Sequence, residues 1–105
     1  AALSFFEWIA IGYGDQGIHV SCLCPQGVKT EMLAAERHTG REFLTAGALE
    51  PDEVAAAVVQ GIRDERFLIL PHPEVAEYFR RKAGDYDRWL NGMRRFRERV
   101  LSESR

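Results

Sequence analysis

The amino-acid sequence predicts an α/β fold in which helix, strand, loop, helix and strand follow one another and a helical tail ends the chain. Two short apolar runs, 18–24 and 67–70, each stop at a proline, which is typical of buried strands. Residues 51–64 between them have the apolar spacing of a helix. A strand, a helix and a strand at this separation form a crossover unit with parallel, right-handed pairing. Because two parallel strands alone do not make a stable sheet, we expect the carboxyl-terminal portion of a larger, doubly wound parallel sheet.

Residues 1–13 are predicted to form a helix with apolar side chains on both faces. One face carries Leu3, Phe6, Ile9, Ala10 and Tyr13, and the opposite face carries Phe5, Trp8 and Ile11. A helix that is apolar all round is normally buried, and a chain of 105 residues has little surface with which to cover both faces. We therefore expect a homo-oligomer that associates through helix 1–13.

The predicted strand 18–24 brings the two cysteines onto one face. Ile18, Val20, Cys22 and Cys24 lie on that face, His19, Ser21 and Leu23 on the other, and Pro25 ends the strand. A disulfide framework needs several cysteines separated by loops, and a structural zinc site needs about four ligands. Cys22 and Cys24 are therefore expected to be reduced core side chains of an intracellular protein.

Residues 26–49 have little regular pattern and are long for a loop, so we expect a functional or mobile segment, with a short helix near 31–37. Pro51 at a first helical position, followed by two acidic residues, begins the next helix. Its expected buried stripe is Val54, Ala55, Val58, Val59 and Ile62. The run 67–70 fits a strand that is covered on both faces.

The pattern is helical again from Glu74, and Gly84 and Gly92 permit breaks. We divide the chain into residues 1–73, the sheet portion, and residues 74–105, the tail. The tail carries nine basic and six acidic residues interleaved with aromatic ones, and such residues also serve nucleic-acid stacking and phosphate contact. Because the acidic residues dilute the positive field, we favour an amphipathic helix docked on a neighbour.

The overall composition excludes several classes of function. A formal net charge of −2 predicts neither a nucleic-acid partner nor a membrane surface. No apolar stretch approaches the ~20 residues that span a bilayer, and the first residues lack the basic region of a signal peptide. We expect a cytoplasmic protein. His19, His38 and His72 lack the spacing of metal ligands, so no metal site is predicted.

The segment from Asp15 to Thr30, DQGIHVSCLCPQGVKT, resembles the strand-and-loop signature of the short-chain dehydrogenases/reductases. Other parts match that family in the same order: residues 1–10 resemble the stretch after its Tyr-x-x-x-Lys motif, residues 50–59 its last core helix, and residues 66–71 its last strand. The resemblance implies a Rossmann-type fold. It also implies that the chain starts just after that motif, so that the family's catalytic Ser, Tyr and Lys and its Gly-rich phosphate turn lie upstream.

The resemblance implies part of an NAD(P)-dependent oxidoreductase, which transfers hydride between nicotinamide and an alcohol or carbonyl substrate. It makes Pro25, Gly27, Val28 and Thr30 the expected binding residues for the nicotinamide end of NAD or NADP. The Val28 backbone and the Thr30 hydroxyl have the hydrogen-bonding groups that a carboxamide needs. Gln26 stands where the family most often has glycine, which alters the close backbone approach that glycine permits. A simple turn, with Thr30 as the N-cap of a helix that begins at the next residue, is the alternative.

Met32 and Leu33 follow this loop, and in the resembled family the corresponding segment lies over a small-molecule substrate, which makes them the expected substrate-binding residues. A helix face packed on the core is the alternative. Because the family's acid–base residues and phosphate turn are absent from these 105 residues, we expect the chain alone to be inactive. The alternative function is a non-enzymatic oligomerisation or interaction module built on helix 1–13 and the tail.

Overall fold

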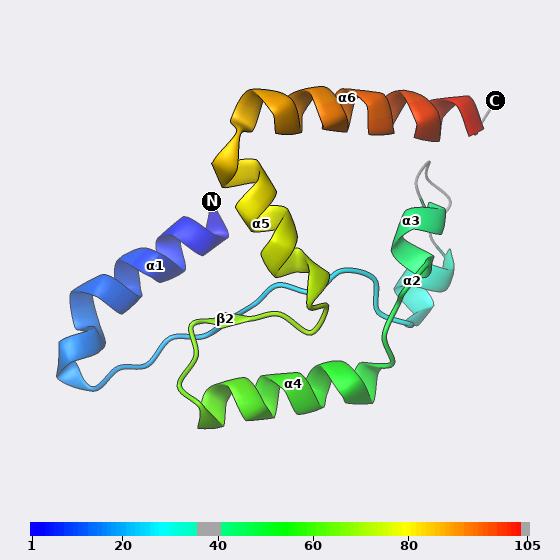
Figure 1. Cartoon of the computed structure of the whole chain (residues 1–105). Helices are drawn as coiled ribbons and strands as arrows, with labels where there is room; N and C mark the ends of the chain where they lie inside the picture. The colour runs from blue at the N-terminus through cyan, green and yellow to red at the C-terminus, as the bar shows by residue number, and fades with distance from the viewer. Residues whose placement is uncertain (36–40, 104–105) are drawn as a thin grey trace.

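The computed structural model describes residues 1–35 and 41–103 (Figure 1). The predicted elements occur in the predicted order, and the structure adds two short helices, at 14–16 and 41–45, that the sequence pattern did not predict. The elements are α1 (Ala2–Tyr13), the short 3-10 helix η1 (Gly14–Gln16), β1 (Cys22–Leu23), α2 (Glu31–Ala35), α3 (Arg41–Thr45), α4 (Pro51–Arg63), β2 (Leu68–Ile69), α5 (Glu74–Gly84) and α6 (Tyr86–Glu103). The chain is thus mixed α/β and mostly helical. Of the predicted helix near 31–37, residues 31–35 are helical and residues 36–37 lie outside the described residues.

The two strands pair in parallel, with Cys22 opposite Leu68 and Leu23 opposite Ile69. The parallel pairing expected of the strand–helix–strand unit is therefore confirmed. Each strand has two residues, fewer than the runs 18–24 and 67–70 that the pattern predicted. The run 67–70 is short and ends at a proline, so the residues before Cys22 have no complete partner strand opposite them.

Helix α4 packs closely on β2 because residue 61 is a glycine. A Cβ atom at Gly61 would come within 2.6 Å of Cγ1 of Ile69, so any larger residue would force the Ile69 side chain or the helix itself to move. Val54 and Gly61 are buried and Val58 is half-buried, and these positions lie three or four residues apart on one side of the helix. This side of α4 forms the contact with the strand pair.

The buried stripe predicted for this helix was too wide. Ala55, Val59 and Ile62 are exposed, the last two by 48% and 60%. They lie on the neighbouring side of α4, one residue further round the helix from Val54, Val58 and Gly61, and the strand pair covers only one side.

The described residues bury little apolar surface. Cys22, Val54 and Ile69 are the buried hydrophobic residues, and α1 has no buried residue at all. The accessible surface is 8293 Å², compared with roughly 6,000 Å² for a compact monomer of this mass. The radius of gyration is 16.5 Å, compared with about 13 Å for a compact domain of this length. The chain therefore presents a large surface for further contacts.

The tail consists of two helices with a break between them. Asp85 is extended, with φ −158° and ψ 94°, and its carboxylate accepts a hydrogen bond from the Arg88 N–H, which caps the start of α6. A break at Gly84 was anticipated, whereas Gly92 lies inside α6. Within residues 1–35 and 41–103, no helix combines the length and apolar character needed to cross a membrane.

Candidate functional site

A hollow of about 280 Å³ lies in the segment that follows the carboxyl end of β1. It is lined by Gln26, Gly27, Val28, Thr30, Met32, Leu33 and Leu44. The hollow thus brings together five of the six residues that the sequence assigned to cofactor or substrate, all except Pro25. In parallel α/β sheets, ligands bind beyond the carboxyl ends of the strands, and the hollow has this location.

The backbone of Val28 is oriented by a parallel bridge to Leu49. The Leu49 N–H donates to the Gly27 carbonyl at 3.2 Å, and the Lys29 N–H donates to the Leu49 carbonyl at 2.9 Å. In a parallel bridge of this kind, the amide and carbonyl of the middle residue point away from the partner strand. The Val28 amide and carbonyl therefore face away from Leu49, and Val28 lines the hollow. No sequence pattern at residues 28 and 49 indicated this pairing.

Thr30 is the N-cap residue of α2. Its Oγ1 accepts a hydrogen bond from the Leu33 N–H at 3.3 Å, and its carbonyl accepts one from the Ala34 N–H at 3.0 Å. The capping alternative considered for this residue is thus observed. Capping is compatible with the predicted role of Thr30 in cofactor binding. The capping bond uses a lone pair of the hydroxyl oxygen and leaves the hydroxyl proton for donation to a ligand.

The close backbone approach in this loop occurs at Gly27. A Cβ atom at Gly27 would overlap the Leu44 carbonyl oxygen, so only glycine allows α3 to lie where it does. The neighbouring Gln26 is fixed differently, since its N–H donates to Nδ1 of His72 at 3.0 Å. From the sequence, the only functional role considered for His72 was that of a metal ligand, and its spacing did not support that role. Its position between two prolines, directly after a predicted strand, was the available signal.

The two predicted substrate residues differ in exposure. Met32 is 84% exposed on α2, whereas Leu33 is half-buried. Met32 therefore does not pack on a core within the described residues. A flexible, exposed thioether beside a hollow is suited to covering an apolar ligand.

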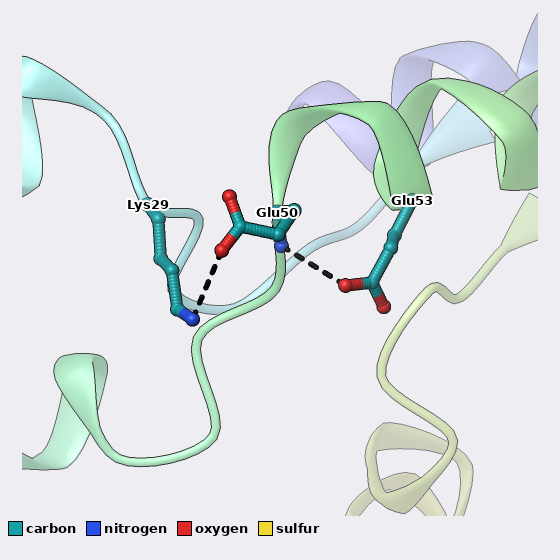
Figure 2. A network of polar contacts seen from close by, with 3 residues as sticks. All are labelled: Lys29, Glu50 and Glu53. Carbon is teal, nitrogen blue, oxygen red and sulfur yellow. Dashed lines mark hydrogen bonds and ion pairs between the residues drawn. The ribbon is translucent and has the colours of Figure 1, made fainter.

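A polar network ties the loop to the start of α4 (Figure 2). Nζ of Lys29 lies 3.0 Å from Oε1 of Glu50, and the Glu50 N–H donates to Oε1 of Glu53 at 3.4 Å. Glu50 is the N-cap of α4 and Glu53 its third residue, so the two form a capping box. The Lys29–Glu50 pair is exposed, and such pairs stabilise a fold by about 1 kcal/mol at most.

The cysteine pair, Cys22 in β1 and Cys24 just after it, does not supply a nucleophile. Both thiols are free, with the Sγ atoms of Cys22 and Cys24 3.8 Å apart. Burial raises the pKa of the Cys24 thiol above the ordinary cysteine value, and the hydrogen bond and charge of Cys22 raise it further. A thiol with a raised pKa remains protonated and unreactive near neutral pH. Among the described residues, no group of three or more His, Cys, Asp or Glu side chains is placed to hold a metal; His38 lies outside them.

Comparison with known proteins finds a dehydrogenase among the relatives of this chain. The chain is 28% identical over 94 residues to the C alpha-dehydrogenase of Sphingobium sp. (strain NBRC 103272 / SYK-6), in an alignment that covers 73% of this chain and 31% of that protein. The chain thus spans about a third of the length of this curated relative. No protein-family model and no solved structure matches the chain. The similarity is therefore to one part of a protein named as a dehydrogenase.

Proposed function

We propose that the chain is the carboxyl-terminal part of an NAD(P)-dependent oxidoreductase of the short-chain dehydrogenase/reductase type. The observation that carries the proposal is the hollow beyond β1, where residues that resemble this family's cofactor loop lie beside its substrate segment. The similarity to a dehydrogenase supports the same class of reaction. The name of that relative indicates a reaction that removes or adds hydrogen, and this general reaction type is all that we infer from it for this chain.

The groups around the hollow suit the nicotinamide end of NAD or NADP. A carboxamide has an N–H donor and a carbonyl acceptor, and the Val28 backbone together with the Thr30 hydroxyl supplies both complements. Gly27 lets α3 close one side of the hollow, and Leu33 and Leu44 give it an apolar wall. The bound nicotinamide would supply or accept the hydride. The chain's own residues would orient the ring, and Met32 and Leu33 would keep water from a small alcohol or carbonyl substrate.

The rest of this enzyme would complete the sheet and supply the acid–base residues. The accessible surface of the chain is about 2,300 Å² larger than that of a compact monomer of this mass, and the sheet of the described residues has two strands. Residues 1–73 would join further strands in a Rossmann-type domain, and residues 74–105 would be its helical tail. A tyrosine upstream would handle the proton, so the chain alone would not turn over substrate. We place this enzyme in the cytoplasm.

The experiment that tests the function is a cofactor titration of the full-length protein. NADH and NADPH are added separately, and nicotinamide fluorescence is followed in the wild type and in Thr30→Val, which removes the hydroxyl at similar side-chain volume. We expect saturable binding of at least one cofactor by the wild type and weaker binding by the variant. The 105-residue chain is assayed in parallel with primary and secondary alcohols and their carbonyl forms. Absence of any nicotinamide binding by the full-length protein, or turnover by the purified chain alone, would contradict the proposal.

A second proposal concerns α1, which we assign to self-association. In the alternative function, the chain would be a non-enzymatic oligomerisation or interaction module that associates through this helix. The rings of Phe5 and Trp8 stack with centroids 6.2 Å apart, and the two side chains are 55% and 64% exposed. Leu3, Phe6 and Ile9 on the other face are half-buried. The exposed aromatic face would pack against a second copy of the chain.

A further inference from the structure

His72 is the buried polar side chain of the described part of the chain, with 2% of its surface exposed. It lies between Pro71 and Pro73, after β2 and two residues before the start of α5. Proline fixes its own φ angle and restricts the residue before it. The backbone that carries the imidazole is therefore restricted on both sides, which suits a side chain that must hold one orientation.

Both ring nitrogens of His72 bond to the backbone of the cofactor loop, across 45 and 46 positions of sequence. The Gln26 N–H donates to Nδ1 at 3.0 Å, and Nε2 lies 3.1 Å from the Gly27 carbonyl oxygen. A backbone N–H can only donate and a carbonyl can only accept. The network therefore assigns the proton to Nε2 and a lone pair to Nδ1, which is one tautomer of the neutral imidazole.

The peptide bonds that His72 holds are those that lead to the hollow. The Gly27 carbonyl accepts from Nε2 of His72 and also from the Leu49 N–H at 3.2 Å, so both of its lone pairs are used. Val28, the next residue, lines the hollow. The imidazole thus connects the segment after β2 to the segment after β1, at the edge where both parallel strands end.

We propose that His72 is a positioning residue for the cofactor loop: its neutral imidazole holds the Gln26–Gly27 backbone so that Val28 and Thr30 face the nicotinamide. This inference rests on the proposed function for what the loop binds. The hydrogen bonding of the loop by His72 stands independently of it. His72 itself does not line the hollow and acts through the peptide groups of its two partners.

Three substitutions in the full-length protein separate the two hydrogen bonds. His72→Asn keeps an acceptor near the Nδ1 position for the Gln26 N–H, and His72→Gln keeps a donor near the Nε2 position for the Gly27 carbonyl. His72→Phe keeps a flat ring and removes both bonds. Val54→Ala is the matched control, because Val54 is buried in α4, at 8% exposure, and is not among the residues that line the hollow.

The first measurement tests the hydrogen bonds between His72 and the loop directly. With histidine labelled with ¹⁵N, the ring signals of His72 are expected to show a protonated Nε2 and an unprotonated Nδ1, in slow exchange. The Gln26 amide is expected to exchange with solvent much faster in His72→Phe and His72→Gln than in the wild type, and to remain protected in His72→Asn and Val54→Ala. A proton on Nδ1, or a ring that averages between tautomers, would overturn the inference.

The second measurement determines how the His72 variants change the KM for the cofactor. His72→Phe is expected to raise the KM for the nicotinamide cofactor roughly tenfold, with a smaller change in kcat. His72→Asn and His72→Gln are expected to give intermediate values, and Val54→Ala the wild-type value despite its loss of stability. An unchanged cofactor KM in His72→Phe would overturn the positioning role. If the wild type binds neither NAD(H) nor NADP(H), the proposed function fails, and with it the cofactor role of His72; the ring and amide signals then decide whether His72 holds the loop.

Discussion

Gly27 lies directly against the backbone of Leu44, so close that a Cβ atom at residue 27 would overlap the Leu44 carbonyl oxygen. Leu44 belongs to α3, and both residues line the same hollow. The position of α3 over the hollow therefore depends on the absence of a side chain at residue 27.

Gly27→Ala is expected to displace α3 and to destabilise the protein by about 1–3 kcal/mol, the usual cost of overpacking. The added methyl group meets backbone, which cannot change rotamer to make room. Urea unfolding gives the free energy, and binding of the nicotinamide cofactor to the full-length protein is expected to weaken in parallel. Gly12→Ala is the control, since a Cβ at Gly12, inside α1, meets nothing within 4 Å. A Gly27→Ala variant as stable as the wild type would contradict the packing described above.

Helix α3 is also held by the tail, through an edge-to-face contact between Phe43 and Phe96 with ring centroids 5.2 Å apart. Phe96→Ala is expected to lower the free energy of unfolding by at least the contribution of such an aromatic pair, which is about 0.5–1.5 kcal/mol. It is also expected to speed amide exchange in residues 42–46. Hydrogen exchange followed by mass spectrometry measures this effect. Phe79→Ala on α5 makes the same chemical change at a residue 41% exposed, and it is expected to leave exchange in residues 42–46 unchanged. Equal amide exchange in residues 42–46 of the two variants would contradict a role of the tail in supporting α3.

The order of the elements was predictable from sequence because it depends on local spacing. The apolar repeat of Val54, Val58 and Ile62, the Pro51 start and the Gly84 break can each be recognised within a few residues of sequence. The strand lengths and the outward side of α4 were not predictable. Both depend on how much of each face is covered by neighbouring structure, and the local sequence pattern contains no information about that coverage.

The candidate site shows the same division. The loop residues Gly27, Val28 and Thr30 could be proposed from sequence because the family resemblance that suggests them lies within one short segment of the chain. The contacts that fix their geometry join distant residues: Gln26 with His72, Val28 with Leu49, and Gly27 with Leu44. One sequence without its fold carries no signal that pairs such residues.

Thr30→Ala is expected to have two separable effects. Loss of the capping bond to the Leu33 N–H is expected to cost about 0.5–2 kcal/mol of stability. Loss of the hydroxyl is expected to weaken cofactor binding by the roughly 0.5–1.5 kcal/mol of one hydrogen bond. Thr30→Ser keeps the hydroxyl and is expected to retain both properties. Thermal unfolding and cofactor titration of the full-length protein measure them. A Thr30→Ala variant that loses stability alone would restrict Thr30 to its capping role.

The raised pKa of Cys24 predicts a loss of stability at alkaline pH. The thiol of the unfolded chain deprotonates near its ordinary pKa, about 8.5, while the folded protein still holds its proton. The folded state then binds more protons than the unfolded state, so the free energy of unfolding falls as pH rises above that value and is unaffected below it. Urea unfolding from about pH 7.5 to about pH 9.5 measures the slope, and Cys24→Ala is expected to reduce it. An identical slope in the variant would exclude Cys24 as its source.

Trp8→Glu is expected to dissociate the protein into monomers or to cause aggregation. Trp8 is 64% exposed and stacks on Phe5, and Ile11 beside them is 84% exposed, so this face of α1 has no cover within the described residues. Each such side chain contributes roughly 1.5–3 kcal/mol when fully buried, and two or three per subunit offset the entropy lost on association. Packing across a two-fold axis would place Trp8 near its own copy, where a glutamate would meet a second like charge.

Light scattering at micromolar concentration tests this assignment on the wild-type chain, on Trp8→Glu and on a control, Leu90→Glu. Leu90 lies on α6 and is 40% exposed, so its substitution adds the same charge at a different apolar position. The wild type and the control are expected to scatter as particles larger than the 12.0 kDa monomer, and Trp8→Glu to lose that state. A monodisperse 12.0 kDa wild-type particle would contradict self-association. Dissociation by Leu90→Glu alone would move the interface from α1 to the tail.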